Sequence, residues 1–202
     1  MLISWMVKMK LIAITGSIGC GKTTIAGIIK KLGYAVFDVD AWVRRMYFKK
    51  DFIKQIQEVF PQVVQNGIVD KRALRNIVFN DKQKLKKLES MTHPFLKKYF
   101  KSVVKKNGFS QDICFLDVAL LFEMGWEKYC HRVIVADVPY EVQKKRVMLR
   151  DNVNGDDFDK INNVQMDNKA KKLLADVVIN TDKPINLLKL DVITLLKELE
   201  ND

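Results

Sequence analysis

The stretch TGSIGCGKTT at residues 15–24 combines glycines with a lysine and a threonine at the spacing of a phosphate-binding loop. The pattern Gly-x-x-x-x-Gly-Lys-Thr runs from Gly16 to Thr23. Glycines permit a tight turn whose backbone N–H groups point inward at an anion, and the next helix adds its positive N-terminal end. In this arrangement Lys22 reaches the β- and γ-phosphates of a nucleotide, and the Thr23 hydroxyl binds Mg²⁺. An ordinary glycine-rich turn is the alternative.

The residues on either side of the loop favour phosphate binding. The apolar run KLIAIT (10–15) predicts a buried strand before it. Ile25, Ile28 and Ile29 recur at helical spacing after it, and Gly33 predicts the C-cap of that helix. A strand, a glycine-rich loop and a helix in this order form the context in which the motif binds phosphate.

Five short apolar runs predict the strands of a parallel sheet. They are continuous rather than alternating, as expected where helices cover both faces, and helical patterns separate them. The sequence therefore predicts an α/β fold with about five parallel strands, in which ligands bind beyond the carboxyl ends of the strands. The runs are 10–15, 34–38, 113–117, 132–137 and 176–179, and residues at their carboxyl ends are Gly16, Asp38, Asp117 and Asp137.

Two carboxylates lie at the end of the second run and just after it. Asp38 and Asp40 are two positions apart, which in an extended segment projects them to the same side. Beside a phosphate loop, one can accept the proton of an attacking hydroxyl, while the other holds Mg²⁺ through water or orients the loop. A helix N-cap is the alternative use of an aspartate here. Arg44 follows one helical turn later and is suited to bidentate contact with a phosphate.

Two long segments interrupt the alternation of strands and helices. The crossover at 41–112 contains several helical patterns, which predict a helical subdomain over one side of the site. It contains a turn at Asn66–Gly67, and Pro94 is expected to break or restart a helix because it lacks an N–H. The polar segment from Tyr140 to Ala175 resembles a mobile lid.

The bulk composition narrows the classes of protein. A chain of 202 residues fits one domain with elaborations. The net charge of +11 favours a polyanionic partner, which a nucleotide already supplies. Residues 1–8 are expected to be an N-terminal extension without a basic leader or a small-residue cleavage site, and no apolar run approaches the length of a membrane span.

The cysteines indicate a reducing, cytoplasmic setting. Cys20, Cys114 and Cys130 show no paired spacing, and the two histidines are too few to complete a zinc site with them. Cys20 lies inside the phosphate loop, where a helix N-terminus can lower a thiol pKa. A small residue that simply fits the loop is the favoured interpretation of Cys20.

Residues 10 to about 190 resemble the dephospho-coenzyme A kinase family. The order and spacing of several motifs carry the resemblance, since each motif alone is weak apart from the phosphate loop. They are TGSIGCGKTT, the Asp38-x-Asp40-x-x-x-Arg44 segment, KRALRNIVF, LESMTHPFL with His93 and Pro94, ALLFE at 119–123, the segment around Arg146 and Arg150, Gln165, and ADVVIN ending at Asn180.

The resemblance implies a three-layer α/β/α P-loop nucleotide-kinase fold. Its core would comprise residues 9–40, 113–139 and 173–202, with 41–112 as a helical insert that binds the acceptor and 140–172 as the lid. The family's reaction transfers the γ-phosphoryl group of ATP to the ribose 3′-hydroxyl of dephospho-CoA, which yields CoA and ADP in the final step of CoA biosynthesis. The implied partners are ATP with Mg²⁺ and dephospho-CoA, with no nucleic acid or membrane, in a monomer or weak homo-oligomer.

Site residues carry over from the family motifs position by position. Asp40 would take the hydroxyl proton, Lys22 with Mg²⁺ would neutralise the transferring phosphoryl group, and Arg146 would add charge as the lid closes. The implied ATP contacts are Gly16, Ser17, Ile18, Gly19, Cys20, Gly21, Lys22, Thr23, Thr24, Arg146, Arg150 and Asn180, with Thr23 as the metal ligand. The implied acceptor contacts are Asp38, Asp40, Arg44, Arg72, His93 and Glu123.

Some of these roles have plain structural alternatives. His93 is expected to pack at a helix start rather than to do chemistry, and Glu123 is equally suited to a structural salt bridge. The sequence also departs from the family pattern. Ala119 replaces a usual proline, and Thr-Asp-Lys follows Asn180 where a glycine is usual, which puts the adenine-side contact of that loop in doubt.

Three other functions compete with this interpretation. Another small-molecule or nucleoside monophosphate kinase would share the sheet and lid, but not the combination of Asp-x-Asp, His-Pro and Leu-Leu-Phe-Glu motifs. A GTP-dependent switch would carry an Asn/Thr-Lys-x-Asp stretch, which the sequence lacks. A basic nucleic-acid-binding module is suggested by the charge alone, without interleaved aromatic and basic residues.

Overall fold

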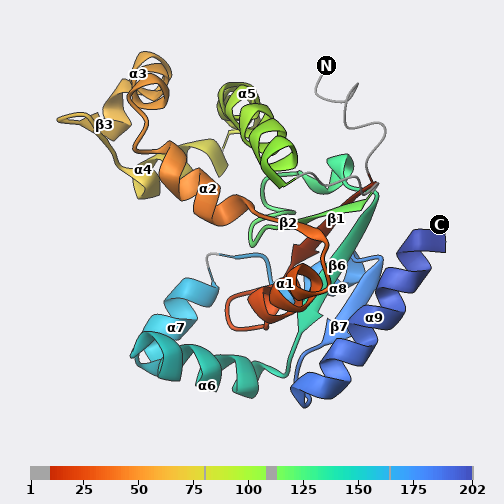
Figure 1. The fold of residues 1–202 in the computed structure, drawn as a ribbon. Helices are drawn as coiled ribbons and strands as arrows, with labels where there is room; N and C mark the ends of the chain where they lie inside the picture. Colours follow the sequence, from red (N-terminus) through yellow and green to blue (C-terminus); the bar gives the residue numbers. More distant parts are fainter. Residues whose placement is uncertain (1–9, 80, 108–112, 164, 202) are drawn as a thin grey trace. The chain divides into compact units, whose positions relative to one another are not determined.

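The computed structural model describes residues 10–79, 81–107, 113–163 and 165–201 (Figure 1). The chain forms two compact units, of which one comprises residues 39–109 and the other contains the large sheet. The extension expected at residues 1–8 lies outside the described residues. In the part of the chain that is described, no helix is both long and apolar enough to cross a membrane.

The sheet has five parallel strands in the order β2-β5-β1-β6-β7. All five start and end within one residue of the predicted runs, which confirms the predicted α/β fold. A continuous apolar run identified each strand because both faces of the sheet are covered, so side chains on each face are largely buried. The strands are β1 (Lys10–Thr15), β2 (Ala35–Asp38), β5 (Ile113–Asp117), β6 (Arg132–Asp137) and β7 (Val177–Asn180).

The order of the strands places a switch point at the centre of the sheet. From β1 the chain passes to β2 on one side, whereas β6 and β7 lie on the other side. Ligands of such sheets bind where the strand order reverses, beyond the carboxyl ends. The register aligns Asp117 of β5 with Ile14 of β1 and with Asp38 of β2, so two aspartates stand side by side at this edge.

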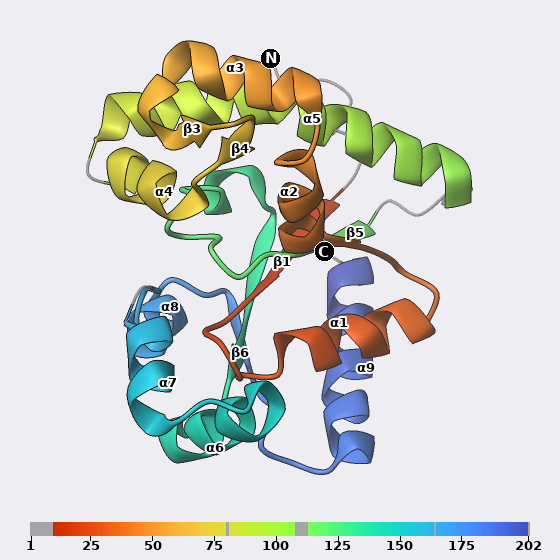
Figure 2. The same cartoon turned by 90° about the vertical axis from the view of Figure 1, so that its left-hand side faces the viewer.

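Helices α1 (Lys22–Lys31) and α9 (Ile185–Asn201) pack together on one face of the sheet. The predicted apolar stripe of α1 is buried there, with Ile25 and Ile29 fully enclosed. Figure 2 shows α8 (Asn168–Leu173) on the opposite side of β6 from both helices. Gly33 adopts φ +95° just after α1, and its N–H donates to the Lys30 carbonyl at 3.1 Å, as expected for a glycine that ends a helix.

The segment predicted to be a lid contains three helices and belongs to the same compact unit as the sheet. They are α6 (Tyr140–Asp151), α7 (Gly155–Asn162) and α8. Gln143 on α6 donates to Asn162 on α7 at 2.9 Å, and the fully buried Phe158 packs edge-on against Tyr140. A short 3₁₀ turn, η3 (Glu127–Tyr129), precedes β6.

The described residues 39–79 and 81–107 form a helical unit with one small hairpin. Asn66 and Gly67 both have positive φ, 51° and 73°, as expected for a two-residue type I′ turn. The predicted turn joins two short antiparallel strands, which were not predicted from the sequence. The elements are α2 (Val39–Met46), α3 (Lys50–Val59), η2 (Pro61–Val63), β3 (Val64–Gln65), β4 (Ile68–Val69), α4 (Lys71–Phe79) and α5 (Lys82–Asn107).

The expected break at Pro94 is wrong, because α5 continues through it. A proline inside a helix removes one N–H donor and costs about 3 kcal/mol. The turn before it is well anchored, since Leu88 and Met91 are buried and the Thr92 hydroxyl donates to the Leu88 carbonyl at 2.7 Å. Most of the stability of a helix comes from packing rather than propensity, so one missing hydrogen bond does not end it.

Candidate functional site

The phosphate loop between β1 and α1 depends on three glycines with positive φ. Gly16, Gly19 and Gly21 have φ values of 146°, 79° and 84°, which side chains disfavour. Distant segments also fill the space beside each glycine. A Cβ would come within 2.5 to 2.7 Å of one atom in each case: Ala136 O at Gly16, Val147 Cγ2 at Gly19 and Thr181 Oγ1 at Gly21. Glycine is therefore required here by backbone conformation and by packing together.

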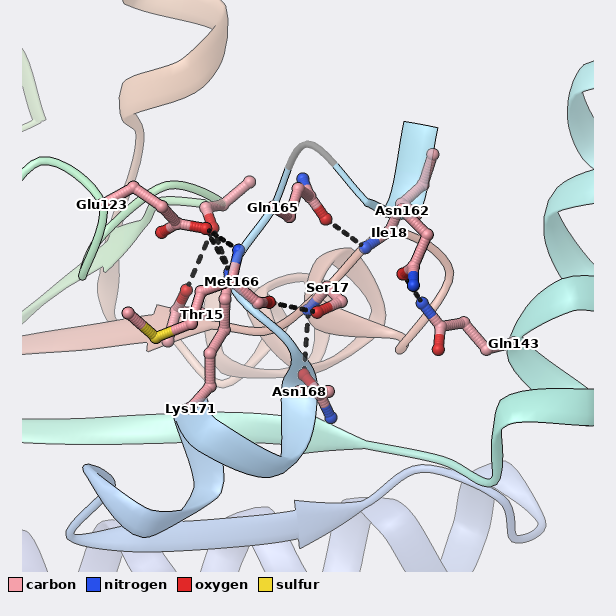
Figure 3. Close-up of polar contacts among 11 residues, drawn as sticks. Thr15, Ser17, Ile18, Glu123, Gln143, Asn162, Gln165, Met166, Asn168 and Lys171 are labelled. Carbon is pink, nitrogen blue, oxygen red and sulfur yellow. Dashed lines mark hydrogen bonds and ion pairs between the residues drawn. The ribbon is translucent and has the colours of Figure 1, made fainter. Parts of the chain in front are cut away.

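The first half of the loop is held by side chains from the segment before α8 and from the start of that helix (Figure 3). The Ser17 N–H donates to Asn168 Oδ1 at 3.0 Å, and the Ile18 N–H donates to Gln165 Oε1 at 2.9 Å. The Ser17 hydroxyl also donates to the Met166 carbonyl at 3.3 Å. Gln165 was recognised in the sequence only as part of a motif, and Asn168 was missed because nothing local connects it with a loop 151 positions away.

The second half of the loop leads into the N-terminus of α1. Gly21 is the N-cap residue, Lys22 begins the helix, and the Thr23 and Thr24 side chains are exposed. The first N–H groups of a helix have no acceptor within the helix, and the helix dipole makes this end positive. An anion placed here meets backbone donors, two hydroxyls and the lysine, which is the arrangement that binds nucleotide phosphates.

Lys22 forms an ion pair with Asp117 at the carboxyl end of β5. Both side chains are largely buried, with 15% and 8% of their areas exposed. The sequence placed Asp117 at a strand end but not in the site. The missing information was the strand order, which sets β5 next to β1 and brings this carboxylate to the loop lysine.

The oxygen donors at this edge fit Mg²⁺. Mg²⁺ bound with a nucleotide takes one or two protein ligands and completes its shell with phosphates and water. The Thr23 hydroxyl and the Asp117 carboxylate are hard oxygen donors of this kind. No cluster of three or more acidic, histidine or cysteine side chains suited to a metal occurs within the described ranges.

Arg146, expected to act on the transferring phosphoryl group, contacts the segment after β7 in this structure. Its guanidinium donates to the Thr181 hydroxyl and carbonyl, each at 3.0 Å, and lies 3.8 Å from Asp182. The Thr181 hydroxyl in turn donates to the Cys20 carbonyl at 2.8 Å. Thr181 therefore connects Arg146 to the phosphate loop, a role that the sequence analysis missed.

The other predicted ATP contacts outside the loop have partners in the protein. Arg150 makes a bidentate pair with the adjacent Asp151, with both distances 2.8 Å. The Asn180 side chain accepts from the Asp182 N–H at 2.7 Å. Asp182 stands in the stretch where the family pattern expects a glycine, and its carboxylate faces Arg146.

Four of the predicted site residues lie in the helical unit, and the geometry of one pair differs from expectation. The prediction that Asp38 and Asp40 share an extended segment is wrong, because β2 ends at Asp38 and α2 begins at Val39. Asp40 is in the first turn of α2, and Arg44 follows it by four positions on the same helix.

Arg72 and His93 lie on other helices of that unit, and Glu123 lies in the sheet unit. Arg72 is exposed in the first turn of α4, where its N–H donates to Asp70 Oδ1 at 2.9 Å. His93 is half-buried inside α5 rather than at a helix start. Glu123 accepts from the Met166 N–H at 2.8 Å and pairs with Lys171, so a structural salt bridge is present at this residue.

Cys20 is enclosed by the loop and its neighbours. None of its area is exposed, and burial raises the pKa of its thiol from 9.0 to about 11, with a further contribution from the charge of Asp137. The loop environment therefore keeps the thiol neutral instead of activating it. This supports the interpretation of Cys20 as a small residue that fits the loop.

A family model and the sequence relatives identify one family, while the solved structures with a similar fold also include other small-molecule kinases. A family model described as Dephospho-CoA kinase matches residues 10–186. The Dephospho-CoA kinase of Bartonella quintana is 37% identical over 194 residues, which cover 95% of this chain and 98% of the relative. A crystal structure of TT1252 from Thermus thermophilus has a TM-score of 0.75 at 31% identity and covers 95% of this chain and 98% of that one. A shikimate kinase from Bacteroides thetaiotaomicron, 16% identical with a TM-score of 0.52 over 96% of this chain and 99% of its own, shares the fold.

Cys20 is expected to resist alkylation in the folded protein. A pKa of about 11 in place of 9.0 lowers the thiolate fraction at pH 8 by about a hundredfold, and burial slows access further. Iodoacetamide labelling at pH 8, followed by peptide mass mapping, measures the rate. The control is the same protein in guanidinium chloride, where Cys20 should react as an ordinary thiol. Rapid labelling of native Cys20 would contradict the assignment.

Proposed function

Because the chain belongs to the dephospho-CoA kinase family, we propose that it transfers the γ-phosphoryl group of ATP to the ribose 3′-hydroxyl of dephospho-CoA, the final step of CoA biosynthesis. The observation that carries the proposal is the phosphate loop, whose lysine is paired with a buried aspartate at the carboxyl edge of the sheet. Phosphoryl transfer depends mainly on positioning and charge stabilisation, and this edge supplies both.

On the donor side, the loop and the N-terminus of α1 bind the β- and γ-phosphates of ATP. Lys22 exchanges Asp117 for phosphate oxygens, so its charge is available where negative charge moves during transfer. Thr23 and Asp117 would hold Mg²⁺, which supplies charge neutralisation across the phosphates. With Lys22 turned to the nucleotide, the Asp117 carboxylate would be available as a ligand for Mg²⁺.

On the acceptor side, residues 41–112 bind dephospho-CoA. Arg44, Arg72 and His93 contact its phosphates or framework, and a guanidinium is suited to bidentate phosphate contacts. Asp40 accepts the proton from the 3′-hydroxyl as the hydroxyl attacks the γ-phosphorus. Asp38, at the carboxyl end of β2, orients the phosphate loop. The support is the Asp-x-Asp-x-x-x-Arg motif together with the position of Asp40 and Arg44 on one helix.

The segment 140–172 is proposed to act as a lid over the nucleotide. Arg146 adds positive charge during transfer, and its bonds to Thr181 keep it beside the phosphate loop until then. Arg150 and Asn180 complete the nucleotide contacts. We place the enzyme in the cytoplasm because its three cysteines are free. The oligomeric state stays as expected from the family, a monomer or weak homo-oligomer.

The proposal is tested by measuring ADP release with dephospho-CoA beside AMP, CMP, shikimate and adenosine. We expect kcat/KM for dephospho-CoA to exceed that for each other acceptor by at least about a hundredfold, because the acceptor site binds the whole molecule. Mass spectrometry should identify CoA as the product, and EDTA should abolish turnover. Preference for AMP, CMP or shikimate would identify a different small-molecule kinase.

Asp40→Asn should lower kcat by about 10²- to 10⁴-fold, because the amide is nearly isosteric but cannot accept the hydroxyl proton. The affinity for a non-hydrolysable ATP analogue should stay within about twofold of wild type, since only proton transfer is lost. Asp38→Asn is the matched control and should lower kcat less. An inactive Asp38→Asn beside an active Asp40→Asn would reverse the assignment of the base.

A further inference from the structure

Lys171 on α8 is a fully buried lysine that the mechanism above does not use. Its ammonium donates to the Ala119 carbonyl at 2.9 Å and pairs with Glu123 Oε1 at 3.1 Å. The Glu123 side chain is itself 10% exposed. Figure 3 shows Lys171, Glu123 and Met166 converging beside the phosphate loop. An enclosed charge in this position calls for an explanation.

The same two acceptors also bind the segment before α8 and the start of the phosphate loop. Glu123 Oε1 accepts from the Met166 N–H at 2.8 Å, and the Ala119 carbonyl accepts from the Thr15 hydroxyl at 3.4 Å. The ammonium of Lys171 therefore joins three stretches of chain: the end of β1, the turn after β5, and the approach to α8. Each of them borders the phosphate loop.

Stability alone is a weak reason for such a pair. Moving two charges out of water costs several kcal/mol each, and apolar residues of similar volume often replace a buried ion pair without loss of stability. A directional contact between two charged groups does, however, fix where the attached segments lie. The positions fixed here are those of residues 165–168, whose side chains hold the loop through the N–H groups of Ser17 and Ile18.

We infer that Lys171 is a positioning residue for phosphoryl transfer, which sets the phosphate loop through Glu123 and the segment 165–168 without touching either substrate. Asn168 also fixes the segment to the end of β6, because its amide donates to Asp137 Oδ1 at 2.7 Å. Without the ammonium, Met166 and Asn168 are no longer held in place against Ser17. The backbone N–H groups of the phosphate loop that face the phosphates then lose their alignment. The inference rests on the proposed function only in that the loop binds ATP.

The test measures ligand affinity in Lys171→Met, with Lys169→Met as the matched control on the exposed side of the same helix. Calorimetry with a non-hydrolysable ATP analogue and Mg²⁺ should show binding at least tenfold weaker for Lys171→Met and unchanged for Lys169→Met. The affinity for dephospho-CoA should stay within twofold of wild type, because the lesion is confined to the phosphate loop. A general loss of structure would weaken both ligands alike.

Thermal melts establish that each variant is folded at the temperature of the measurement. If Lys171→Met fails to fold, the double variant Lys171→Met/Glu123→Gln removes both charges with little change of shape and is measured in its place. It too should bind the analogue at least tenfold more weakly. A folded variant with wild-type affinity for the analogue, or with equal losses for both ligands, overturns the inference. A wild-type protein that binds the analogue but leaves dephospho-CoA unphosphorylated refutes the proposed function, and the inference is then tested by the analogue affinities of Lys171→Met and Lys169→Met alone.

Discussion

The conformation of the phosphate loop is the constraint on which the rest of the site depends. A loop that turns its backbone N–H groups toward an anion needs positive φ at several positions, and this chain meets that need with Gly16, Gly19 and Gly21. The open side of each glycine is occupied by β6, α6 or the segment after β7. The fold therefore packs closely against the loop at each of these glycines.

Charge placement follows from the same geometry. Parallel strands bring Asp38, Asp117 and Asp137 to one edge of the sheet, and the loop adds Lys22 there. Asp117 pairs with Lys22, while Asp137 pairs with Lys172 at 2.8 Å and accepts from Asn168. Asp117 and Asp137 therefore have cationic partners at this edge, and a triphosphate with its metal would replace Asp117 as the partner of Lys22.

The features that were predicted correctly from the sequence are those that depend on neighbouring residues. Continuous apolar runs located all five strands of the parallel sheet, and the glycine spacing identified the phosphate loop. The errors at Pro94 and Asp40 share a cause, because both inferences used the preference of one residue or one short segment where packing decided the outcome. The predicted role of Arg146 remains a proposal, although its contact with Thr181 was not foreseen.

Contacts between distant segments were beyond the sequence analysis. Asp117 lies 95 positions from Lys22, and Asn168 lies 151 positions from Ser17, so no periodicity links them. Strand order brings the first pair together, and the return of the chain before α8 brings the second. These pairings become visible only when the complete fold is known. The residues that support the loop were therefore harder to recognise from the sequence than the residues of the loop itself.

The protein's own side chains preform the phosphate loop before any nucleotide binds. Amide hydrogen exchange, followed by NMR on the nucleotide-free protein, tests it most directly at Ser17 and Ile18, whose N–H groups donate to Asn168 and Gln165. Both amides should be protected without ligand, and Asn168→Ala should selectively remove the protection at Ser17. Exchange of both amides at the rate of an unstructured peptide until ATP is added would contradict it.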